Sequence, residues 1–433
     1  MLQETFLYFL WKYQYFDTQA LTTTQGETIS VEVPGWRNNF AGPDFKEAKI
    51  RINRMQWIGS VEMHVKASDW YRHGHQDDPN FANVVLHVVW EADRQVMRQD
   101  GTPIPTLALQ DLVKPELLRR YERMLESPEK IPCHSSLKKV KAITRLSMVE
   151  RVVVSRVQDK AAIFNQLLAG NKQDWEETAY QWLVKGFGFK ANADNMLNLA
   201  QSLPLKVLQK RRNQLMQVEA LLFGQAGFLD VEIKDDYPEK LQREYRFLRN
   251  KYGLRNRVHY NDWHFTRVRP YNYPTVRLAQ LAALIVKFPH IFSFFSEISD
   301  FNTVMADLEV KQSDYWSRHY AVDKPSARKM GTLSKAAREN LIINTTVPFL
   351  AALSKAKDNQ SYLEVALNLL AGIPGEKNHI TELWTRYGWN VSSAFDSQGL
   401  IQLYNHFCTQ KRCVECAIGL ELIRPTTKLE VLK

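Results

Sequence analysis

Two acidic residues near the N-terminus are placed where they could share one metal ion. Asp44 follows the turn-forming pair Gly42-Pro43, and Glu62 lies eighteen residues further along in an alternating stretch. If the residues between them form a hairpin, Asp44 heads one strand and Glu62 lies on its neighbour, so the two carboxylates meet. Oxygen ligands of this kind suit Mg²⁺ or Mn²⁺. The pair therefore predicts that Asp44 and Glu62 bind a divalent metal.

The strand that carries Glu62 adds two basic groups on the same face. Residues two apart on a strand point to one side of a sheet, which places Glu62, His64 and Lys66 in one polar row. Either His64 or Lys66 would orient an attacking water and offset charge on a phosphate as its ester bond breaks. With Asp44 and Glu62 as metal ligands, this pattern predicts phosphodiester hydrolysis.

A second set of candidate ligands follows directly after that strand. His73-Gly74-His75 presents two imidazoles within a few residues of Asp69, and His64 or His87 would be a third. Zinc hydrolases use mixed sets of histidine and carboxylate ligands. The alternative hypothesis is a zinc-type hydrolase built on this loop, or a loop that supplies residues to the pocket of the acid pair. Exposed loops that bind nothing also collect these residue types.

The four cysteines form a third set. Three of them have the spacing Cys408-x4-Cys413-x2-Cys416, and Cys133 lies in an irregular stretch beside Pro132. Clustered thiols in a cytoplasmic protein bind metal more often than they form disulfides. The triple has the spacing of plant-type iron-sulfur ferredoxins, in which the fourth thiolate follows the triple instead of preceding it. The spacing predicts an iron-sulfur cluster or a zinc site; the alternative is that the cysteines are buried small apolar side chains.

The segment around the acid pair resembles the PD-(D/E)XK, or restriction-endonuclease-like, superfamily. The pattern of that superfamily is an acid after proline at the start of one strand and acid-x-lysine on the next, and Pro43-Asp44 and Glu62-Met63-His64 occupy these places. Because His64 stands at the lysine position, the resemblance gives the role of the lysine to His64 or to Lys66. It also implies an acid on the first helix, for which Glu4 is the candidate. The resemblance covers about the first quarter of the chain and implies a metal-dependent nuclease.

Two further resemblances concern the rest of the chain. Some nucleases of that superfamily join their two ends with an iron-sulfur cluster held by one early and three late cysteines, although Cys133 here follows the nuclease segment. The whole chain also resembles a bacterial family of unknown function, which implies relatives but no activity. The residues that carry this second likeness are Gly42-Pro43-Asp44-Phe45, Val61-Glu62-Met63-His64, Ser68-Asp69-Trp70 leading into His73 and His75, Asn344, Asp396-Ser397-Gln398 and the late cysteines.

The elements that position these residues can be predicted from the hydrophobic pattern. Residues 28–33, 45–55 and 57–65 alternate like half-buried strands, whereas 83–90 is a nearly continuous apolar run typical of a strand buried on both faces. Turn signals at Asp100-Gly101 predict a hairpin that closes with residues 105–109. An amphipathic helix is expected at the N-terminus.

Beyond Pro115 the apolar residues recur with the period of an α-helix. We therefore expect an α+β or α/β protein. Residues 1–112 would form a restriction-endonuclease-like mixed sheet with flanking helices, and residues 113–433 a large, mostly helical region that carries the cysteine cluster.

Composition narrows the class of protein. The 57 basic residues exceed the 47 acidic residues by ten, which favours polyanionic partners such as nucleic acid. The most apolar stretch is interrupted by polar residues and proline, so we expect a cytoplasmic protein without a membrane anchor. The best hypothesis is a nuclease that hydrolyses DNA with Mg²⁺ or Mn²⁺. The alternatives are a DNA-binding protein that keeps the fold without catalysis and the zinc-type hydrolase of the His73 and His75 loop.

Overall fold

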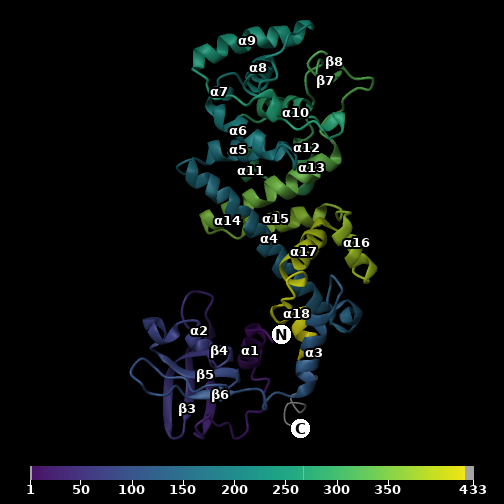
Figure 1. Ribbon diagram of the computed structural model, residues 1–433. Coiled ribbons are helices and arrows are strands. Elements are labelled where there is room, and N and C mark those ends of the chain that lie inside the picture. The colour runs from purple at the N-terminus through teal and green to yellow at the C-terminus, as the bar shows by residue number, and fades with distance from the viewer. Residues whose placement is uncertain (1, 267, 425–433) are drawn as a thin grey trace. The chain divides into compact units, whose positions relative to one another are not determined.

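The computed structural model of the protein describes residues 2–266 and 268–424, and the chain divides into two compact units (Figure 1). Unit 1 consists of the first 150 residues, the short segment Arg386–Gly388 and the segment that begins at Ile401. Unit 2 consists of Arg151–Thr385 and Trp389–Leu400. The unit that carries the sheet thus extends past residue 112, where we expected the domain boundary, and it includes the late cysteines.

Unit 1 is built on a mixed β-sheet, as expected for the N-terminal region. Its strands follow the order β1-β3-β4-β5-β6, with β2 paired to the start of β3. β3 is antiparallel to both β1 and β4, whereas β4, β5 and β6 run parallel to one another. The strand bounds are β1 (Ile29–Val33), β2 (Trp36–Arg37), β3 (Phe45–Ile52), β4 (Met55–Lys66), β5 (Val84–Glu91) and β6 (Thr106–Ala108).

The prediction that a hairpin joins β5 and β6 is wrong. The turn at Asp100-Gly101 closes only a small loop, in which Met97 bridges Pro103. The chain then re-enters the sheet in the same direction as β5, so β6 is parallel to it. A turn signal in the sequence marks where the chain reverses, but it does not say which two segments pair.

The two faces of β4 have different neighbours. Val61 and Met63 are buried in one core together with Phe6 and Leu10 of helix α1 (Glu4–Tyr13). Because side chains alternate along a strand, Glu62 and its even-numbered neighbours face the opposite side. Helix α1 therefore covers one face of the sheet and leaves the other face to the polar row.

A crossover segment, residues 67–83, covers that other face between β4 and β5. It consists of short turns: α2 (Asp69–Arg72), η1 (His75–Asp77) and η2 (Pro79–Phe81). Trp70 and Phe81 anchor it by packing with Val89 in a second buried cluster. Two large aromatic anchors stabilise it by roughly 1.5–3 kcal/mol each through burial.

The remainder of unit 1 packs against the same core as α1. Cys413 and Ile423 belong to this core, together with Leu117 and Tyr121. The elements that contribute to it are α3 (Pro115–Glu126), η8 (Cys413–Glu415) and α18 (Ala417–Ile423). Unit 1 also contains η3 (His134–Lys139), the start of α4 (Ala142–Gly170) and η7 (Tyr404–Cys408).

Unit 2 is mostly helical, as the sequence predicts. Among the described residues, no helix is long and apolar enough to cross a membrane. The remaining elements are α5 (Trp175–Phe187), α6 (Ala193–Ser202), α7 (Leu205–Gln209), α8 (Leu215–Gln225), α9 (Asp236–Tyr252), η4 (Tyr260–Asp262), η5 (Pro270–Asn272), α10 (Pro274–Lys287), α11 (Ile291–Ser296), α12 (Phe301–Asp307), β7 (His319–Ala321), β8 (Lys324–Pro325), α13 (Lys335–Leu341), the π-helix η6 (Ile342–Thr346), α14 (Val347–Lys357), α15 (Ser361–Gly372), α16 (His379–Arg386) and α17 (Ala394–Leu403).

Candidate metal centre

The polar face of β4 is buried although it carries ionisable groups. Glu62 and His64 are only 5% and 1% exposed, and His87 on β5, the register partner of Glu62, is fully buried. His64 Nδ1 lies 2.8 Å from His87 Nε2. Burial of so many polar atoms is costly unless they bind one another or a ligand.

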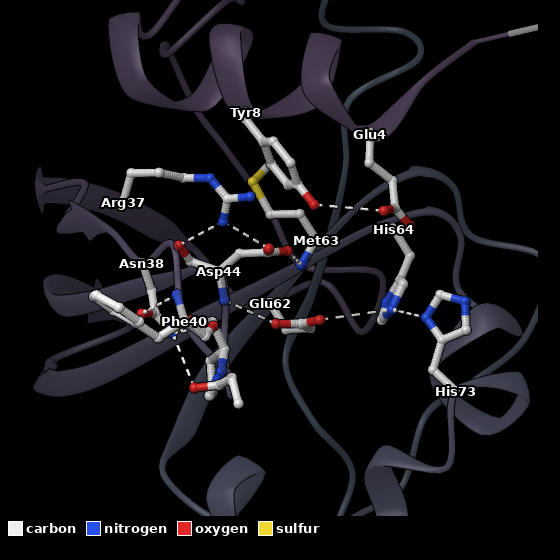
Figure 2. A network of polar contacts seen from close by, with 12 residues as sticks. Glu4, Tyr8, Arg37, Asn38, Phe40, Asp44, Glu62, Met63, His64 and His73 are labelled. Carbon is white, nitrogen blue, oxygen red and sulfur yellow. Dashed lines mark hydrogen bonds and ion pairs between the residues drawn. The ribbon is translucent and has the colours of Figure 1, made fainter. Parts of the chain in front are cut away.

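The crossover segment brings two more imidazoles to this face. His73 Nδ1 lies 3.2 Å from His64 Nε2, as Figure 2 shows. His75 Nε2 lies 3.3 Å from Glu62 Oε1, and His64 Nε2 lies 3.6 Å from the same oxygen. Gly74 has φ of +73°, a left-handed conformation that glycine adopts easily, and this bend lets both flanking histidines point to one place.

We call Glu62, His64, His73 and His75 the metal centre. One ring nitrogen from each histidine lies within 4.8 Å of the other two. A tetrahedral zinc site with ligand bonds of ~2.0–2.1 Å places neighbouring donor atoms about 3.3 Å apart. Of the proposed ligand atoms, His64 Nε2 and His73 Nδ1 have this spacing, at 3.2 Å. The donor set therefore fits a transition metal such as zinc, with three imidazole ligands and a carboxylate beside them.

Burial favours the neutral form of the central histidines. It lowers the pKa of His64 well below the usual value, and it lowers the pKa of His87 to about 3. Neutral imidazoles offer the lone pair that a metal needs. If His64 Nε2 is a ligand, its Nδ1 carries the proton and donates to His87 Nε2, which fixes the ring in the way that partners of metal-bound histidines usually do.

Burial has the opposite effect on the carboxylate of the centre. It raises the pKa of Glu62, and the nearby charge of Asp44 acts in the same direction, whereas the hydrogen bond with His75 lowers it. The ring of His75 is held in place by Phe81, whose ring centroid lies 3.8 Å away. Three lone pairs and a carboxylate oxygen that face one another repel unless a proton or a cation lies among them.

Asp44 and Glu62 lie against each other, but their oxygens have different partners. The Asp44 amide donates to Glu62 Oε2 at 3.0 Å, and the Met63 amide donates to Asp44 Oδ2 at 3.0 Å. Arg37 Nη1 donates to Asp44 Oδ1 at 2.7 Å (Figure 2). Burial raises the pKa of Asp44, and Arg37 opposes this shift. Asp44 thus has an arginine counter-ion. Its amide binds Glu62 Oε2, and the other oxygen of Glu62, Oε1, faces His64 and His75.

Two other residues suggested by the sequence lie at the edge of the site. Lys66 is half-exposed at the end of β4, and its ammonium group pairs with Glu91 at 3.2 Å. Glu4 accepts a hydrogen bond from the Tyr8 hydroxyl at 3.4 Å, and burial raises its pKa. The structure therefore groups His64 with Glu62 and does not group Lys66 with them.

Arg37 and Tyr8 were not suggested by the sequence. The Arg37 guanidinium lies 3.7 Å from the centroid of the Tyr8 ring while it pairs with Asp44. Arg37 belongs to the two-residue strand β2, which pairs with the start of β3. Its position in a turn-rich stretch near Asp44 was a weak local signal, but no spacing rule links it to the carboxylate.

A polar hollow lies along β4 beside the metal centre. It has a volume of about 310 Å³ and is lined by Pro43, Lys46, Ser60, Asn80 and Asn83, among others. Ser60 precedes Glu62 by two residues and is therefore on the same face of the strand. The hollow offers room for a small polar group at Ser60, two residues before Glu62.

The four cysteines lie in unit 1 and form no disulfide. Burial raises the pKa of Cys133, Cys408 and Cys413, and other thiols of the set contribute to each shift, which indicates that they are neighbours. Within residues 2–266 and 268–424, however, the cysteines form no group with the short spacing of ligands to one metal ion. Metal or cluster binding by Cys133, Cys408, Cys413 and Cys416 stays a prediction.

Comparison with known proteins identifies the family. Residues 4–379 match the model of the family described as "Protein of unknown function (DUF2851)", and the chain belongs to this family. No curated protein and no solved structure matches the chain. The likeness to the PD-(D/E)XK superfamily gains no support from these comparisons and stays a prediction.

Proposed function

We propose that this member of the DUF2851 family is a metal-dependent hydrolase that cleaves phosphodiester bonds in nucleic acid. A transition metal would be held by His64, His73 and His75, with Glu62 beside it. The observation that supports the proposal is the approach of three imidazole nitrogens to within 4.8 Å of one another, with Glu62 Oε1 3.3 Å from His75 Nε2 and 3.6 Å from His64 Nε2.

Each residue of the metal centre has a distinct part in this proposal. A bound divalent metal would supply a water of lowered pKa, whose oxygen would form the new bond to phosphorus while the bond to one ester oxygen breaks. Glu62 Oε1, next to two of the ligand nitrogens, is placed to take the proton from that water as general base. His87 holds the ring of His64, and the amide of Asp44 holds the other oxygen of Glu62. Arg37 donates to Asp44 and holds it in place.

Three features favour nucleic acid as the substrate. The net charge of +10 favours a polyanion. In unit 1 the exposed residues Lys138, Lys139 and Lys141 lie next to the start of α4, where they can contact phosphates. The hollow at Ser60 is polar and is lined by Lys46, together with Glu47. The likeness of Pro43-Asp44 and Glu62-Met63-His64 to the PD-(D/E)XK pattern adds DNA as the expected polymer.

A second candidate is a nucleic-acid-binding protein without hydrolysis. Two observations favour it: Arg37 neutralises Asp44, and Lys66 pairs with Glu91 and not with the acid pair. Both remove charged groups that a nuclease of the PD-(D/E)XK pattern would use. The two candidates differ in whether any metal supports cutting.

The experiment compares cutting and binding in matched variants. Purified protein is incubated with linear double-stranded and single-stranded DNA in the presence of Zn²⁺, Mn²⁺ or Mg²⁺. The variants are Glu62→Gln, His73→Ala and, as a matched control, Glu122→Gln, whose side chain is exposed on α3. Loss of a general base lowers the rate by about 10²–10⁴. We expect such a loss in Glu62→Gln with DNA retention unchanged, and normal cutting in the control.

Two outcomes contradict the proposal. Cutting by Glu62→Gln at the wild-type rate removes the assigned role of Glu62. Salt-sensitive DNA retention without cutting in any metal supports the binding candidate instead.

A further inference from the structure

Unit 2 contains a cavity that is separate from the metal centre. It has a volume of about 400 Å³, and its walls come from α5, the turn after it and the π-helix η6. α5 and the turn after it contribute Trp182, Lys185, Phe189 and Lys190 to the wall. The π-helix contributes Asn344 and Thr345. A cavity of this size suits a small organic ligand.

The backbone around the cavity is irregular in two places. π-helical turns are rare and are frequently found at functional sites. Phe189 has φ of +50°, a left-handed conformation that is strained for an aromatic residue. Gly186 allows α5 to approach the π-helix, because a Cβ there would lie 2.2 Å from Thr345 Oγ1. The cavity wall thus depends on two conformations that ordinary packing does not favour.

One buried polar atom in the wall lacks a partner. Thr345 is 1% exposed, and its hydroxyl makes no hydrogen bond among the described residues. An unsatisfied buried hydroxyl costs about 1–3 kcal/mol, which a ligand atom would recover. The neighbouring Asn344 is held on both sides: its Oδ1 accepts from Lys160 at 2.9 Å and its Nδ2 donates to the Asn340 carbonyl at 3.1 Å.

The aromatic side chains of the wall are fixed, and cations lie beside them. The Trp182 indole donates to the Thr345 carbonyl at 2.9 Å, and the Arg277 guanidinium lies 4.6 Å from the Phe189 ring. Lys185 is 4.0 Å from the exposed Asp194, a surface pair that contributes little. Lys190 is exposed. Fixed aromatic rings suit a planar base, and lysines suit a phosphate.

We propose that this cavity binds a nucleotide. The base lies against Trp182 and Phe189, the phosphate lies near Lys185 and Lys190, and a polar atom of the ligand pairs with the Thr345 hydroxyl. This site does not depend on the function proposed for the metal centre. Its chemistry is recognition of a planar aromatic group that carries a negative charge.

The test is calorimetric titration of the full-length protein with AMP, GMP, CMP and UMP. The buffer contains EDTA, so that the metal centre contributes no bound ion. Inorganic phosphate and adenosine are titrated separately, to distinguish a site for the whole nucleotide from a site for one of its parts. We expect at least one nucleotide to bind more tightly than phosphate or adenosine.

Two variants and one control locate the binding. Lys190→Gln is expected to weaken binding about tenfold, because it removes a charge-assisted contact with the phosphate. Thr345→Val is expected to weaken binding without lowering the unfolding temperature, since it removes a hydroxyl that has no partner in the free protein. Lys240→Gln, on the exposed surface of α9, is the control and should bind like wild type.

Clear results would overturn the proposal. These are the absence of saturable nucleotide binding, wild-type affinity in both Lys190→Gln and Thr345→Val, and binding of phosphate or adenosine as tightly as the nucleotide. A drop in the unfolding temperature of Thr345→Val would assign that hydroxyl to the fold and not to a ligand.

Discussion

Metal binding should stabilise unit 1, and the substitution His73→Ala should remove most of this effect. His73 is exposed, so alanine at this position costs the metal-free fold little. Its ring nitrogen lies 3.2 Å from that of His64, however, and its loss leaves two of the three imidazoles. The variant therefore separates metal affinity from folding.

The size of the effect follows from mass action. A ligand that binds only the folded state, at a free concentration a hundredfold above its Kd, stabilises that state by about 2.7 kcal/mol. For a unit of roughly 190 residues, each kcal/mol raises Tm by about 2–4 °C, so the expected shift is roughly 5–11 °C. If His73→Ala weakens Kd a hundredfold, the same metal concentration stabilises by only about 0.4 kcal/mol, and the shift falls to about 1–2 °C.

Differential scanning calorimetry of protein stripped of metal, with and without added Zn²⁺, measures both shifts. His379→Ala, an exposed histidine of unit 2, is the matched control and should keep the full shift. The reasoning is refuted if Zn²⁺ leaves the unfolding of wild-type unit 1 unchanged, or if His73→Ala shows the same shift as wild type.

Three further predictions address other parts of the protein. Arg37→Met should lower the free energy of unfolding by about 1–3 kcal/mol in denaturant titrations, because it leaves the mostly buried Asp44 carboxylate without its counter-ion; an unchanged midpoint would be inconsistent with that role. Burial raises the pKa of Glu219 from the ordinary 4.5 to about 7, so wild-type stability should fall as the pH rises through this window, where the folded protein holds the proton more tightly than the unfolded chain. Glu219→Gln should then stabilise by up to about 3 kcal/mol at pH 8 and by almost nothing at pH 4, and an equal gain at both pH values would argue against it. For the cysteines we expect iron or zinc in protein purified without oxygen, with loss of the metal in Cys413→Ser; metal analysis that finds neither element would leave the thiols as buried apolar side chains.

The strands and the polar row of unit 1 were accessible from the sequence because their signals are local. Alternation over residues 57–65 fixes which side chains share a face, and the apolar run of 83–90 marks a buried strand. The structure has β4 and β5 at these positions, with Glu62 and His64 on one face. Period and composition act within a few residues, so they can be seen without the tertiary fold.

The convergence of the metal centre depends on contacts that are distant in the sequence. His73 and His75 approach Glu62 because Trp70 and Phe81 anchor the crossover segment on the sheet, and no local pattern reveals this packing. The sequence offered the two histidines either as a rival to the acid pair or as a loop that supplies residues to the same pocket, and it did not decide between these alternatives.

Other differences have the same origin. The pairing of Arg37 with Asp44 depends on β2, a strand of only two residues. The direction of β6 depends on where the chain re-enters the sheet, and the place of the late cysteines in unit 1 depends on packing against a core formed by the first residues of the chain. Tertiary contacts determine these pairings and strand directions, and local propensity and periodicity in the sequence do not describe such contacts.

The position of a bound metal ion tests the central claim most directly. In crystals grown with Zn²⁺, anomalous difference density collected at the zinc edge should show one strong peak within bonding distance of His64 Nε2, His73 Nδ1 and His75 Nε2. A peak between the carboxylates of Asp44 and Glu62, with none at the imidazoles, would contradict the account and restore the acid pair as the metal site.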